Sequence, residues 1–71
     1  MTKLRSGSGR DILIEIVTLG AYAKVTAIDS ATGVEISLTG PRNAPRASLE
    51  AAAIAKLEFV LKKKNAGPQP R

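Results

Sequence analysis

Three charged residues are the first candidates for chemistry in this chain: Glu15, Lys24 and Glu35. In an antiparallel sheet they would project from one face, and a lysine between two carboxylates can act as a tuned acid–base group. The alternative is a cross-strand charge cluster that helps to set the strand register. Because no nucleophile or cleft-forming pattern accompanies these residues, we favour the charge cluster and predict no catalytic residue.

The composition restricts the possible chemistry further. Among its 71 residues the chain has no His and no Cys. Disulfides and the common zinc and haem arrangements are therefore excluded. A general base near neutral pH would have to be a strongly shifted Glu or Lys. We expect a protein that is not an enzyme and that uses no cofactor and no metal.

Basic residues define a second candidate site. Arg42 and Arg46 precede a predicted helix start near Ser48, where exposed N–H groups can hold an anion such as phosphate. The alternative is a solvated loop with Ser48 as an ordinary N-cap. The lysines Lys62, Lys63 and Lys64 follow at the other end of the helix, where positive charge is favourable. Together these five residues are the candidate contacts for an anion or for nucleic acid.

The net charge of +5 belongs to the ends of the chain. Between Asp11 and Leu61 there are four basic and six acidic residues, so this section is net acidic. A folded nucleic-acid reader normally carries a basic patch on its own surface. Basic ends can still give weak, salt-sensitive attraction, so nucleic-acid binding is the alternative function.

The apolar pattern predicts the elements that position these residues. Residues 12–19, 22–29 and 34–39 are rich in β-branched residues or alternate apolar with polar side chains, which is typical of strands. Gly20-Ala21 suits a two-residue type II′ hairpin turn. Gly40-Pro41 should end the sheet. Apolar residues at helical spacing then predict a helix from Ser48 to about Lys63. The predicted fold class is α+β, with a three-stranded antiparallel meander and one C-terminal helix on one face.

The two-residue turn also predicts the register of the first hairpin. It pairs Leu19 with Tyr22 and Val17 with Lys24, and the pairing continues to the far end of the hairpin. Because side chains alternate between faces, one face is wholly aliphatic. The helix should cover that face with Leu49, Ala53, Leu57, Val60 and Leu61.

The length allows one domain, which we place at residues 10–63. Residues 1–9 contain Ser6-Gly7-Ser8-Gly9, and residues 64–71 contain Gly67, Pro68 and Pro70. Both segments are predicted to be disordered tails. So short a domain has a thin stability margin, and self-association is a common compensation.

Exposed apolar residues are the main indication of function. One helix covers one sheet face, so the other keeps apolar side chains, and the first predicted strand is an edge without Pro or Lys. The candidate interface consists of Leu13, Val17, Tyr22, Ile28 and Phe59. We expect a homodimer, or a complex with another protein, in the cytoplasm. No stretch is long and apolar enough for a membrane span.

Five segments resemble a family of very short alphaproteobacterial proteins classed as a domain of unknown function, over roughly residues 9–62. They are residues 9–15, 20–27, 32–37, 40–41 and 56–61. This resemblance implies a bacterial cytosolic origin and no known activity.

A second resemblance concerns the fold alone. Three strands and an alanine-rich helix are similar to the second half of a double-stranded RNA-binding domain, which grips RNA by shape. The chain departs from it in three ways: it lacks the first helix, its Gly20-Ala21 loop is short, and Pro45-Arg46 replaces lysines at the helix start.

Overall fold

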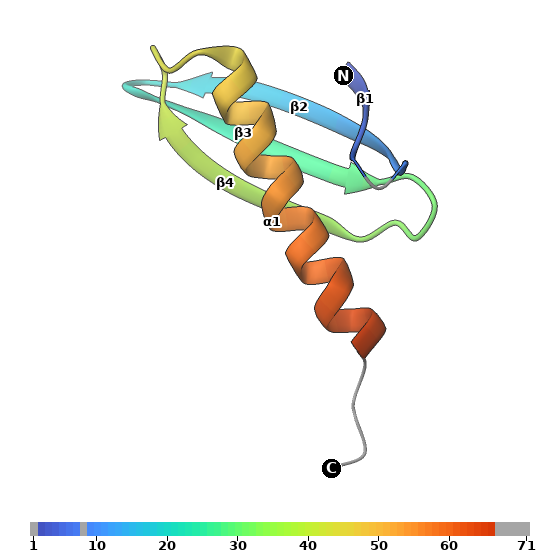
Figure 1. The fold of residues 1–71 in the computed structure, drawn as a ribbon. Helices are drawn as coiled ribbons and strands as arrows, with labels where there is room; N and C mark the ends of the chain where they lie inside the picture. The colour runs from blue at the N-terminus through green and yellow to red at the C-terminus, as the bar shows by residue number, and fades with distance from the viewer. Residues whose placement is uncertain (1, 8, 67–71) are drawn as a thin grey trace.

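In a computed structural model of the chain, residues 2–7 and 9–66 are described, the last three by their backbone alone. Four strands form one antiparallel sheet in the order β1-β2-β3-β4, and one helix crosses a single face of it (Figure 1). The elements are β1 (Thr2–Arg5), β2 (Asp11–Leu19), β3 (Tyr22–Asp29), β4 (Glu35–Pro41) and α1 (Arg46–Ala66).

The predicted hairpin register is confirmed for β2 and β3. Leu19 lies opposite Tyr22 and Val17 opposite Lys24, and the pairing continues to Ile12 and Asp29. Gly20 has a φ of 60° while Ala21 keeps a negative φ, as a type II′ turn requires. A two-residue turn leaves little freedom in register, which is why the local sequence predicts it well.

The prediction of three strands is wrong, because β1 adds a fourth. β1 pairs with β2 from Thr2 opposite Ile14 to Arg5 opposite Asp11. Leu4 joins the helix side of the sheet, where it packs on the core. Thr2–Arg5 lies in the stretch for which the sequence predicted a disordered tail. Beyond this strand the Gly9 amide donates to the Ser6 carbonyl at 2.9 Å.

β4 also runs further than predicted, since Gly40 and Pro41 belong to it. Proline is tolerated there because β4 is an edge strand, where an outward position needs no donor. The helix begins at Arg46, so the predicted N-cap Ser48 lies inside the first turn. Pro45 supplies the carbonyl that accepts hydrogen bonds from the amides of Ser48 and Leu49.

One aliphatic layer between sheet and helix forms the core, as predicted. Its buried members are Ile12, Ile14, Ala23, Val25, Ala27, Ile36, Leu49, Ala53, Leu57 and Leu61. Val60 is half-buried at its margin. The helix packs mainly on β3 and β4, and its last turns project past the sheet (Figure 1). No helix in the described part of the chain is long and apolar enough to cross a bilayer.

Candidate interaction surface

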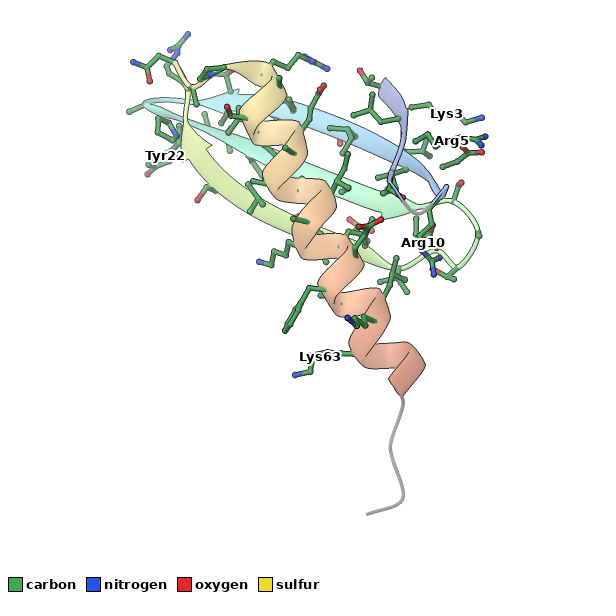
Figure 2. The ribbon with its side chains drawn as sticks, in the orientation of Figure 1. Lys3, Arg5, Arg10, Tyr22 and Lys63 are labelled. Atoms are coloured by element: carbon green, nitrogen blue, oxygen red, sulfur yellow. The ribbon has the colours of Figure 1, made fainter. Side chains whose placement is uncertain are left out.

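Three large apolar side chains remain exposed at the turn end of the β2–β3 hairpin. Val17 is 42% exposed, Leu19 49% and Tyr22 58%. All three project from the face without the helix, since Leu19 lies opposite Tyr22 and Val17 is two residues from Leu19. Tyr22 marks this end of the sheet in Figure 2. We call these three residues the hairpin-end patch.

The other predicted sheet residues lie apart from this patch. Leu13 and Ile28 face each other near the opposite end of the sheet, and both are half-buried. The polar pair Glu15 and Thr26 separates them from Val17. Lys3 on β1 lies beside Leu13. The predicted interface therefore divides into an exposed group and a partly covered group.

Phe59 belongs to a different surface. It is 61% exposed on α1, and the ammonium of Lys63 lies 5.7 Å from its ring centroid. Because a helix turns about 100° per residue, Phe59 points away from the sheet-facing neighbours Leu57 and Leu61. The structure does not bring it together with the hairpin-end patch.

Two residues of the hairpin-end patch, Val17 and Leu19, lie on a stretch of β2 without a strand partner on its outer side. β1 covers β2 only from Asp11 to Ile14. Among the described residues no strand pairs with the outer side of residues 15–19, which we call the open segment. Exposed strand edges of this kind are templates for pairing with another chain.

The direction of the backbone groups in the open segment follows from the hairpin. In a two-residue hairpin the flanking pair, here Leu19 and Tyr22, exchanges hydrogen bonds, and the pattern alternates along an antiparallel pair. At the far end of β2 the Asp11 carbonyl accepts from the Ser30 amide at 3.1 Å, consistent with this alternation. Ile16 and Thr18 therefore direct their N–H and C=O groups outward.

The opposite edge of the sheet is covered by a side chain from the helix. The Lys56 ammonium donates to the backbone carbonyl of Ser37, at the outer side of β4, over 3.3 Å. Pro41 in the same strand has no N–H to offer. Lysine and proline are two common means of blocking a strand edge. The β4 edge is therefore partly blocked against pairing with another strand, whereas the open segment of β2 is not.

The predicted anion-binding residues do not form one site. Arg42 donates to the Gly20 carbonyl at 3.2 Å. Arg46 binds the Glu50 carboxylate at 2.8 Å and the Thr2 hydroxyl at 2.9 Å. With 21 residues, α1 is about 30 Å long, so Lys62 and Lys63 lie far from both arginines. The side chain of Lys64 is outside the described residues.

Three further basic residues lie at the β1 end of the sheet: Lys3 and Arg5 lie close together in Figure 2, and Arg10 lies apart from them and pairs with Asp29. Lys3 and Arg5 both lie near Asp11, at 3.7 Å and 3.2 Å. Sequence reasoning missed this group. The alternation Lys3-Leu4-Arg5, followed by Asp11 across a short turn, is the signal that could have revealed it.

Asp29 is fully buried on the helix side of β3. Its Oδ2 accepts from Arg10 at 3.3 Å and from both the amide and the hydroxyl of Thr32, at 3.1 Å and 2.7 Å. Its Oδ1 has no hydrogen-bond partner among the described residues. These contacts tie the β1–β2 turn to the β3–β4 turn, which is a structural role.

Glu15, Lys24 and Glu35, the first chemical candidates, lie exposed on the helix-free face. Register separates them: Glu15 is opposite Thr26, Lys24 is opposite Val17, and Glu35 is opposite Ile28. None of the ion pairs among the described residues joins these three.

Comparison with known proteins agrees with the family resemblance. Residues 9–64 match a family model described as "Domain of unknown function (DUF6898)". No curated protein and no solved structure matches the chain.

Proposed function

We propose that this chain, which belongs to that family of unknown function, is a small protein-interaction module that associates with itself. The observation that carries the proposal is the overlap of the hairpin-end patch with the open segment of β2. A role without catalysis, and a place in the bacterial cytoplasm, belong to the same proposal and rest on the sequence.

Two kinds of unsatisfied surface lie at this end of the sheet, exposed apolar side chains and unpaired backbone groups. Val17, Leu19 and Tyr22 expose apolar area that gains roughly 25 cal/mol per Å² when it leaves water. Ile16 and Thr18 offer backbone groups that a neighbouring strand would satisfy. Because both lie at one end of the sheet, a single contact would bury the apolar side chains and pair the backbone together. A domain of this size gains stability from such a contact.

Sedimentation velocity over a range of protein concentrations tests the proposal. We expect the wild-type chain to show a concentration-dependent dimer. Leu19→Ser should shift it toward monomer, because it removes the larger of the two aliphatic patch side chains on the open segment. Phe59→Ser is the matched control, since Phe59 is also a large exposed apolar residue but lies on the helix. A wild-type monomer at high micromolar concentration, or equal effects of the two variants, would contradict the proposal.

Nucleic-acid binding is the weaker alternative. Arg42 and Arg46 already make contacts within the protein and lie far from the lysines at the other end of α1. If it were the function, an RNA duplex should bind with affinity that falls steeply with salt. Replacing Lys62, Lys63 and Lys64 together with glutamine should then weaken that binding.

A further inference from the structure

We infer that two copies of the chain pair β2 against β2, antiparallel, around a two-fold axis that passes beside Val17. The inference rests on the proposed self-association and specifies its geometry. It would join the two sheets into one continuous sheet, in which β1 of each copy lies end to end with β2 of the other copy.

The register follows from the length of the open segment. β1 occupies the outer side of β2 as far as Ile14, and the turn begins at Gly20, so within residues 2–7 and 9–66 no strand pairs with the outer side of residues 15–19. A two-fold axis must relate this segment to itself, and its midpoint is Val17. Ile16 of each copy then lies opposite Thr18 of the other, and their outward N–H and C=O groups can exchange hydrogen bonds.

The side chains are compatible with this register. The two Val17 residues meet on the helix-free face, next to each other and flanked by the two Leu19 side chains. Each Leu19 lies opposite Glu15 of the second copy, so neither carboxylate faces a like charge. The Lys24 residues are one strand further out on each side. With a spacing of about 4.8 Å between strands, they are about 14 Å apart.

The other edge is less suited to the same pairing. A second copy at β4 would have to displace Lys56 from the Ser37 carbonyl, and Pro41 would leave one acceptor without a donor. The contact through β2 needs no displacement of a described side chain from a backbone group. The structure therefore favours a closed dimer over a growing chain of sheets.

A single introduced cysteine tests the register, because the chain has none of its own. In the inferred dimer the two Val17 residues form a non-hydrogen-bonded pair, with Cα atoms about 4.5 Å apart. That distance is within the range of a disulfide. Val17→Cys should form a disulfide-linked dimer under mild oxidation. Lys24→Cys is the control on the same face, and at about 14 Å it lies beyond the disulfide limit of about 7 Å.

A second pair of variants tests the backbone contact without a cysteine. Thr18→Pro removes an outward N–H and leaves the β2–β3 ladder in place, so the dimer dissociation constant should rise about tenfold or more. Thr39→Pro makes the matching change at the outer side of β4 and should leave that constant unchanged.

The outcomes separate the two proposals. If the wild type dimerises but Val17→Cys cross-links no better than Lys24→Cys, or Thr39→Pro weakens the dimer as much as Thr18→Pro, this register is wrong and self-association stands. If the wild-type chain is a monomer, both proposals fail.

Discussion

A Cβ atom placed at Gly40 would lie 2.8 Å from Cδ2 of Leu49. Gly40 is near the end of β4 and Leu49 is in the first turn of α1, so the end of the Leu49 side chain rests directly on the strand backbone. Gly40 does not have a positive φ. The preference for glycine there comes from the close contact of the Leu49 side chain and not from backbone conformation.

Gly40→Ala should therefore destabilise the fold through packing alone. We expect a loss of about 1–3 kcal/mol, which for a domain of this size lowers the melting temperature by roughly 4–8 °C per kcal/mol. Thermal unfolding followed by circular dichroism measures it. Gly7→Ala is the control, because a Cβ at Gly7 meets nothing within 4 Å. Equal melting temperatures for the two variants would refute the close approach.

The stability of the fold should depend strongly on the cation that pairs with the buried Asp29. Arg10→Met removes the guanidinium and leaves a fully buried carboxylate with Thr32 alone. We expect a loss of about 1–3 kcal/mol in the free energy of unfolding, measured by urea titration. Arg5→Met makes the same change at the more exposed Asp11 and should cost about 0–1 kcal/mol. If Arg5→Met lowers the free energy of unfolding as much as Arg10→Met, the burial of Asp29 does not make its ion pair more stabilising.

We expect Lys56 to keep further copies of the chain from adding to the β4 edge of the sheet. Lys56→Met removes the ammonium that covers the Ser37 carbonyl and leaves an apolar side chain beside the β4 edge. With both edges open, we expect species larger than a dimer, visible by sedimentation velocity at concentrations where the wild type shows none. Lys62→Met, at an exposed helix position away from both edges, should leave the distribution of species unchanged. A Lys56→Met profile identical to the wild type would mean that β4 is protected in another way.

The β2–β3 hairpin and the covered sheet face could be predicted because their signals are local. Two turn residues set the register from Leu19 opposite Tyr22, and alternation then assigns every side chain to a face. The same alternation identified Val17 and Tyr22 as exposed residues of the helix-free face. Helical spacing of Leu49, Ala53 and Leu57 likewise identified the buried face of α1.

β1 could not be predicted by these means. It contains one aliphatic residue, Leu4, between two cations. No turn signal next to it distinguishes it from a flexible segment. Its pairing depends on a sheet that already exists, with Asp11 to attract Lys3 and Arg5. The helix also begins earlier than predicted, because Pro45, and not the nearby Ser48, accepts the first helical hydrogen bonds.

The sequence by itself determined which side chains share a face, because alternation and helical spacing depend only on neighbours along the chain. Tertiary structure alone decided which of those side chains meet. It added β1 and separated Leu13 and Ile28 from Val17. It also placed Phe59 on a separate surface. One edge of the sheet is covered by Lys56, and the other is left open. The physical reason is that strand edges and helix placement depend on contacts between distant segments, which no local pattern encodes.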